Sequence, residues 1–443
     1  MSNGLTQKHN AKSLLLFAMP TIIMMVFMSI YTMVDGIFVA NFVSPDALAG
    51  LNIVIPALSI LVSVSVMLSA GGSVVISRKL GEGKEKEARE DLSFLVLLTI
   101  VIGAVVTVLG LVFADPILRL LGATDALYDV AYDYYKVLIM FTVPCLLQVQ
   151  FQYFFVTAGA PNLGLWCVVA GGVSNIILDY VFIALLDLEI QGAALATGIG
   201  YSIPAVVGII WFLVNRKGML HFTTPRPRLQ SLWESIVNGI ASMIINLAGA
   251  TVTWLYNRVI VVYLQEAGIS AATVVLYARF LFNSVLSGYA SGVAPVISFN
   301  YGRKDYDQVK MLFRTSLKAV LVGSAIVFAA SIVLRDAIVN LFVSGEPALA
   351  ELARRGIFLF AFSYLFNGVN TFAATLFSSL NNGKLSALMA SMTTFVFLVA
   401  AMFGLPALGL GADGVWLAVP AAELMSLGLT IFLLKRNQPK YQY

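Results

Sequence analysis

Long apolar segments separated by short polar ones run through the whole chain. A helix that spans a membrane needs about 20 largely apolar residues, and twelve runs reach that length. They are 13–41, 47–77, 92–114, 132–157, 161–186 and 190–214 in the first half, and 232–264, 270–299, 311–334, 352–379, 385–405 and 411–434 in the second. The pattern predicts an all-α integral membrane protein with twelve transmembrane helices in two six-helix bundles.

The longest hydrophilic connector lies between the two sets of runs, at 215–230, and reads NRKGMLHFTTPRPRLQ. Its basic residues and its two prolines are typical of a linker that crosses a membrane surface. We therefore expect an N-terminal six-helix lobe over 1–214, a cytoplasmic linker over 215–230 and a C-terminal six-helix lobe over 231–443.

An internal repeat supports the two-lobe division. The tripeptide VIS at 75–77, followed by Gly81, recurs at 296–298, followed by Gly302. The same offset of 221 carries Asp115, Ile117 and Leu120 onto Asp336, Ile338 and Leu341. Lobes with an even number of spans enter the membrane in the same direction, so the bundles should be pseudo-symmetric about an axis along the membrane normal. Two such bundles that rock about a central site are typical of a transporter with alternating access.

Composition and charge agree with this fold. Hydrophobic residues make up 59% of the chain and charged residues 11%, so the bilayer must solvate most of the surface. Most of the 27 Lys and Arg residues fall in alternate loops, which predicts a multi-pass protein of the inner or plasma membrane with both termini cytoplasmic. The basic residues thus indicate the membrane topology, and we expect no nucleic-acid partner. We expect the lipid bilayer as a partner and a monomeric chain.

Several kinds of chemistry find no support in the sequence. Cys145 and Cys167 both lie inside apolar runs, where a structural disulfide is not expected. The two histidines, His9 and His221, lie in polar segments, and no Cys/His cluster or P-loop is present. We therefore expect a protein that is not an enzyme, that has no cofactor, and that uses an ion gradient for uphill transport.

Ionisable side chains within the runs are the candidates for function, because each costs roughly 2.5–3.5 kcal/mol at mid-bilayer. Asp35 lies in the first helix and Asp179 in the fifth. Asn175 precedes Asp179 by one turn, and Thr197 lies in the sixth helix. A buried carboxyl group can carry a proton, and the same oxygens can bind Na⁺. The alternative is that these groups only hydrogen-bond neighbouring helices.

The remaining candidates concern substrate and conformation. Glu423 can form a buried ion pair with Arg258 or Arg279, or these three residues can line a substrate cavity. The aromatic and thioether side chains of Met28, Tyr31 and Tyr153 suit a pocket for amphipathic cations, and they equally suit packing. Pro20 lies in the same helix as Asp35 and permits that helix to bend.

Three segments resemble motifs of the MATE family, the multidrug and toxic compound extrusion transporters. They are YTMVDGIFVA at 31–40, NIILD at 175–179 and GVAPVISFNYG at 292–302. The resemblance covers nearly the whole chain and implies exchange of H⁺ or Na⁺ for organic, mostly cationic substrates. It places the cation site on Asp35, Asn175, Asp179 and Thr197, which would be the ligands of Na⁺ in a sodium-coupled protein, and a helix bend at Pro20.

The chain departs from the family pattern in its second half. Some members carry acids in the seventh and tenth helices, where this chain has Asn257 and Arg258, and Asn367 and Asn370. Coupling is therefore expected in the first lobe. Three alternatives remain: a flippase or exporter of lipid-linked or metabolic cargo on the same fold, a membrane-embedded transferase, and a channel.

Overall fold

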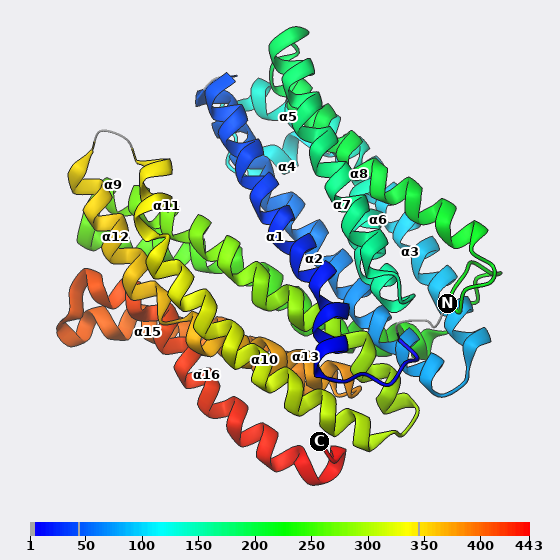
Figure 1. Ribbon diagram of the computed structural model, residues 1–443. Coiled ribbons are helices and arrows are strands. Elements are labelled where there is room, and N and C mark those ends of the chain that lie inside the picture. The colour runs from blue at the N-terminus through cyan, green and yellow to red at the C-terminus, as the bar shows by residue number, and fades with distance from the viewer. Residues whose placement is uncertain (1–4, 43–44, 344–345) are drawn as a thin grey trace. The chain divides into compact units, whose positions relative to one another are not determined.

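Helices are the only regular elements in the described part of the chain, which contains no strand (Figure 1). The computed structural model describes residues 5–42, 45–343 and 346–443; side chains at 35–42 and 45–49 and at positions 52, 250, 257 and 266 lie outside that description. The first helices are α1 (Ala11–Phe42), α2 (Pro45–Gly81), α3 (Glu85–Val112), α4 (Ala114–Leu120), α5 (Tyr128–Met140), α6 (Thr142–Thr157), α7 (Pro161–Asp179), the π-helix η1 (Tyr180–Leu185) and α8 (Glu189–Val214).

The second series begins with the long α9. It comprises α9 (Leu229–Gly302), α10 (Tyr306–Val333), α11 (Arg335–Phe342), α12 (Pro347–Ala361), α13 (Tyr364–Ser379), α14 (Gly383–Ser391), η2 (Met392–Phe397), α15 (Leu398–Leu405), η3 (Pro406–Leu410) and α16 (Gly411–Tyr441). Gln265 interrupts α9 with φ 52° and ψ −145°, so the two apolar runs predicted there are two separate spans.

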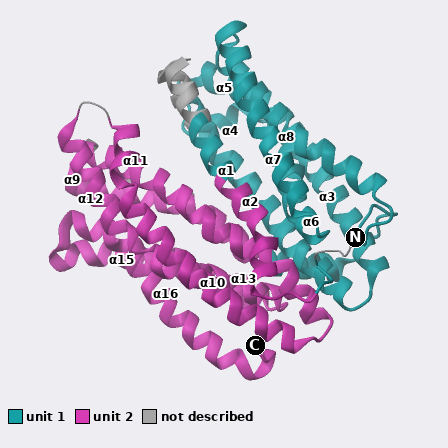
Figure 2. Ribbon diagram, viewed as in Figure 1, with its two compact units in different colours: residues 1–7, 27–239 teal, residues 8–26, 240–443 magenta. Residues whose placement is uncertain are grey.

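The chain forms two compact units, coloured separately in Figure 2. Unit 1 contains Met1–Gln7 and Phe27–Gly239, and unit 2 contains Lys8–Val26 and Ile240–Tyr443. The order of elements in unit 1 recurs in unit 2. Helix α10 begins and ends 221 residues after α3, and α11 begins 221 residues after α4. The secondary structure thus repeats with the offset that the sequence motifs indicate.

The described residues contain nine helices long and apolar enough to cross a membrane, or eleven if each of two bent pairs is one span. One of the nine, Gly383–Tyr441, has 59 residues and covers the last two predicted runs. The positive φ angles of Gly409 (95°) and Gly411 (51°) interrupt it. The structure therefore confirms an all-α membrane fold, and the count of twelve spans stays a prediction.

Two runs that the sequence predicts as continuous helices are bent. The run 132–157 is divided into α5 and α6, which meet at 57°, and the run 352–379 is divided into α12 and α13, which meet at 47°. Pro144 lies in the first turn of α6, where its missing N–H costs no helical hydrogen bond. Counting apolar residues does not reveal such bends, because both arms remain apolar.

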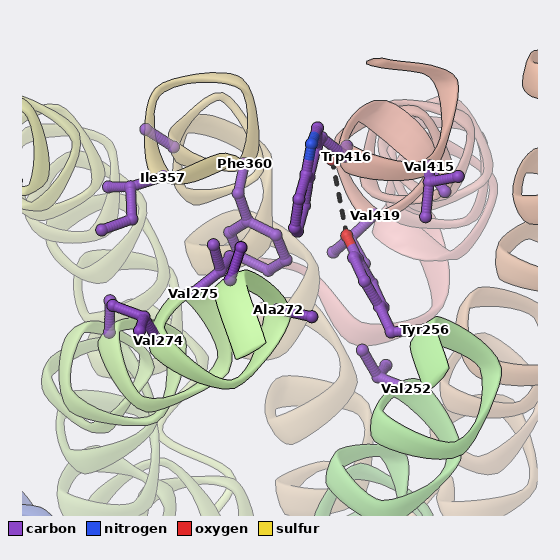
Figure 3. Packing of buried hydrophobic residues seen from close by; sticks show 14 of the residues in the cluster. Val252, Tyr256, Ala272, Val274, Val275, Ile357, Phe360, Val415, Trp416 and Val419 are labelled. Carbon is purple, nitrogen blue, oxygen red and sulfur yellow. Dashed lines mark hydrogen bonds between the residues drawn. The ribbon is translucent and has the colours of Figure 1, made fainter. Parts of the chain in front are cut away.

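An aromatic core packs α16 against α9 within unit 2 (Figure 3). The rings of Tyr256 and Trp416 lie 5.8 Å apart, and the Tyr256 hydroxyl donates a hydrogen bond of 3.5 Å to the Trp416 carbonyl oxygen. Trp416 is fully buried, and Gly356 of α12 leaves room for its indole ring. Glu423 follows Trp416 by two helical turns and therefore shares its face of α16.

The connector predicted as a linker is bound to α3 within unit 1. Arg89 donates a 2.8 Å hydrogen bond to the Met219 carbonyl oxygen, and the Thr223 amide donates one of 2.9 Å to the Ser93 hydroxyl. Arg228 forms ion pairs with Glu90 and with Glu87, the latter at 3.2 Å. The connector is thus fixed to the beginning of α3 by specific polar contacts.

Candidate cation and substrate sites

A small polar cavity lies among α1, α6, α7 and α8 inside unit 1. Its volume is about 10 Å³, which corresponds to roughly one water molecule. The lining residues include four that the sequence analysis singled out, namely Met28, Tyr31, Asn175 and Thr197. The structure therefore brings together residues from three helices that are far apart in the sequence.

Glycines allow α7 and α8 to approach each other closely beside this cavity. A Cβ atom on Gly171 would lie 2.7 Å from the carbonyl oxygen of Gly200, and one on Gly200 would lie 3.2 Å from the Cβ of Asn175. Small residues at such a crossing let two membrane helices pack backbone against backbone. The crossing places the Asn175 amide opposite the Thr197 hydroxyl, to which it donates a long hydrogen bond of 3.4 Å.

Substitution of Gly171 by alanine is expected to lower the stability of unit 1. The added methyl group would meet the rigid backbone oxygen of Gly200, and overpacking of this kind costs about 1–3 kcal/mol. Thermal unfolding of the purified protein in detergent measures the effect. The matched control is Gly428→Ala in α16, where no atom lies within 4 Å of the added Cβ. Equal shifts for both variants would contradict the close-packing argument.

Asp179 is the last residue of α7 and is 1% exposed. It follows Asn175 by one turn, so the two side chains lie on one face of the helix, as the sequence predicts. The π-helix η1 begins directly after Asp179, at Tyr180. Short π-helical turns within α-helices are frequent at functional sites, and nothing in the sequence pattern indicates this one.

Two further predicted positions lie in α1. Asp35 is part of this helix, but its side chain lies outside the described residues, so its role stays a prediction. Pro20 is buried in the part of α1 that belongs to unit 2, where Gly288 and Gly292 of α9 pack against the neighbouring Ile22 and Ala18. A bend at Pro20 stays a prediction as well.

Gln148 and Tyr201 also line the unit 1 cavity, and neither was predicted from the sequence. Gln148, Gln150 and Gln152 are all buried in α6, and such amides inside an apolar run were an available signal. Gln152 lies on the same face as Gln148 and contacts the Met28 sulfur at 3.9 Å. Tyr153 does not line this cavity and is only partly buried.

Unit 2 contains a larger polar cavity of about 90 Å³ between α9, α13, η2 and α16. Glu423 lies in its wall and is 8% exposed. One carboxylate oxygen accepts a hydrogen bond of 2.9 Å from the Asn367 amide, and the other accepts one of 2.7 Å from the Asn370 amide. Thr430 donates to the Asn370 oxygen at 2.8 Å, so a connected polar network holds the carboxylate.

The expectation of an ion pair at Glu423 is wrong for the described residues, where neither arginine forms a salt bridge with it. Arg279 and Glu423, both among the described residues, line this cavity without forming a salt bridge. Arg258 is exposed and lies over the Trp254 ring at 6.0 Å. The partners that the fold brings to the carboxylate are instead the amides of Asn367 and Asn370 in α13. A pattern of apolar runs does not show which polar groups meet.

Polar cavities among membrane-length helices, in two units with the same order of elements, are typical of membrane transport proteins. A family model described as MatE matches residues 20–181 and 239–404. The chain therefore belongs to the MatE family of membrane transporters.

Curated relatives and solved structures agree with this assignment. The chain is 24% identical over 436 residues to the multidrug export protein MepA of Staphylococcus aureus (strain MRSA252), covering 96% of this chain and 94% of that protein. It is 25% identical over 441 residues to MepA of Staphylococcus haemolyticus, with coverages of 96% and 93%.

Two solved structures share the fold along the full chain. A MATE protein in complex with MaL6 superposes with a TM-score of 0.93 at 19% identity, covering 100% of this chain and 99% of that chain. A MOP superfamily transporter from Pyrococcus furiosus, described as having a binding pocket of reverse polarity, gives 0.91 at 19% identity with the same coverages.

Proposed function

We propose that this protein is a secondary active multidrug exporter that exchanges H⁺ or Na⁺ for organic, mostly cationic substrates by alternating access. The observation that carries the proposal is the unit 1 cavity beside the buried Asp179. Its Asn175 and Thr197 offer oxygen atoms, and a carboxyl group one turn away offers a negative charge or a proton site. The coupling ion is the only inorganic partner in this proposal.

Family membership and the MepA relatives support export of small amphipathic molecules. Met28 and Tyr31 line the unit 1 cavity beside the polar groups, and its volume of about 10 Å³ has room for a coupling ion but not for an organic cation. The distribution of Lys and Arg supports a place in the inner or plasma membrane with both termini cytoplasmic. In this proposal the chain works as a monomer.

Reconstituted liposomes test the proposal directly. A fluorescent lipophilic cation such as ethidium is added to liposomes that contain the purified protein. A pH gradient or a Na⁺ gradient is then imposed separately at matched ionic strength. We expect one of the two gradients to drive the dye against its own concentration gradient. A protonophore should abolish only the transport that the pH gradient drives. Absence of uphill movement under both gradients would refute cation-coupled export.

One observation favours a second function, the translocation of lipid-linked or metabolic cargo. Arg279 lies in the wall of the unit 2 cavity, where a phosphate group would find a positive charge. The same liposomes, loaded with a short-chain fluorescent phospholipid, distinguish the two functions. Lipid movement between leaflets without ion-driven dye transport would favour the flippase.

A further inference from the structure

The unit 2 cavity contains a cationic side chain with unused hydrogen-bond donors. Arg279 lines this cavity, and among the described residues it forms no ion pair and no hydrogen bond. A guanidinium offers five N–H donors in a fixed fork, and a charged side chain within a membrane protein is costly unless it is paired. The donors of Arg279 are thus available to an acceptor that enters the cavity.

The nearby carboxylate of Glu423 does not fill that role: its oxygens accept from Asn367 and Asn370, and in the described part of the chain it forms no salt bridge with Arg279. Direct pairing with Glu423 would engage the N–H groups of the guanidinium, whereas the observed arrangement leaves them directed at the cavity they line. Such a site favours a ligand with a hydrogen-bond acceptor that can contact the Arg279 guanidinium.

The rest of the wall suits an organic ligand. Asn283 and Ser287 follow Arg279 at intervals of four residues, so all three lie along one face of α9 and line the cavity. Val252, Leu398 and Val419 supply apolar surface elsewhere in the wall. A volume of about 90 Å³ has room for a charged head group, and the apolar surface accepts the carbon atoms that carry it.

We propose that this cavity is a subsite for the carboxylate group of an amphoteric substrate, with the carboxylate bound by the Arg279 fork. The role of the subsite in export rests on the proposed function above, but binding itself does not. A planar carboxylate matches the guanidinium geometry in a two-point contact, so Arg279 is the residue that would hold the carboxylate of a substrate that carries both charges.

Two dyes that differ by one ester group test the proposal. Rhodamine 110 carries a free carboxyl group, and rhodamine 123 is its methyl ester. Fluorescence anisotropy with purified protein in detergent gives the Kd of each. We expect Arg279→Met to raise the Kd of the acid at least about tenfold, because it removes a charge-assisted contact. The ester should change less than about threefold, and Arg279→Lys should give an intermediate Kd for the acid.

Arg258→Met is the matched control, since Arg258 is an exposed arginine in the other span of α9 and does not line the cavity. It should leave both dyes unaffected. The thermal unfolding midpoint of each variant shows whether it folds, and Arg279→Lys keeps the test decisive if the methionine variant does not. Equal weakening of acid and ester, an unchanged acid Kd, or no binding of the acid to the wild type would overturn the proposal.

Competition identifies the source of the anion. Displacement of the acid dye by benzoate supports the carboxylate subsite. Displacement by a short-chain phosphatidic acid but not by benzoate would overturn it in favour of a lipid phosphate. No ion gradient enters these measurements, so failure of gradient-driven export leaves their outcome unchanged, and failure of carboxylate binding leaves the coupling proposal standing.

Discussion

Replacement of Asp179 by asparagine is expected to reduce gradient-driven efflux to less than about a tenth of the wild-type rate. Asparagine has nearly the same shape, but it neither releases a proton nor balances the charge of a cation. Asp179 is buried at the end of α7, one turn from the Asn175 amide that lines the unit 1 cavity. Dye efflux from liposomes under the effective gradient measures the loss.

A nearby exposed acid provides the matched control for this experiment. Asp187 has a positive φ of 53°, a conformation that asparagine adopts readily, so Asp187→Asn should leave efflux and stability intact. Binding of the dye to detergent-solubilised Asp179→Asn should persist, which would separate lost coupling from misfolding. Normal efflux by Asp179→Asn would remove the coupling assignment, while the fold would remain as described.

Substitution of Lys79 by methionine is expected to lower the free energy of unfolding by about 3 kcal/mol, because it leaves a buried carboxylate without its main partner. Lys79 lies 2.5 Å from Asp91, and the two side chains are only 8% and 3% exposed. Lys79 also donates to the Ser231 hydroxyl at 2.8 Å, so it joins the end of α2 to the beginnings of α3 and α9. Unfolding by denaturing detergent measures the loss.

The double variant Lys79→Met/Asp91→Leu should recover much of that stability, since it removes both charges together. Lys84→Met is the control, because Lys84 pairs with Glu82 at 2.7 Å while its side chain is 53% exposed. Exposed pairs of this kind contribute little, and this variant should unfold like the wild type. A double variant less stable than Lys79→Met alone would contradict the buried-pair argument.

The membrane fold and its internal repeat were predictable from the sequence because both depend on local composition. A span needs only enough apolar residues in succession, and α3 and α10 keep the same offset as the repeated motifs. The Asn175–Asp179 face was predictable for a similar reason, because helical geometry alone places residues four apart on one side. The bends between α5 and α6 and between α12 and α13 were not predictable from hydropathy, since both arms are equally apolar.

Contacts between distant segments required the tertiary structure. The sequence suggested an arginine as the partner of Glu423, but the fold brings the amides of Asn367 and Asn370 to it and leaves Arg279 open to the cavity. Gln148 lines the unit 1 cavity because of the way α6 packs, and the periodicity of the sequence does not indicate that packing. The sequence by itself thus determined an all-helical membrane fold and the helix face that Asn175 and Asp179 share. Only the tertiary structure decided which of those groups meet, because partners depend on how helices cross.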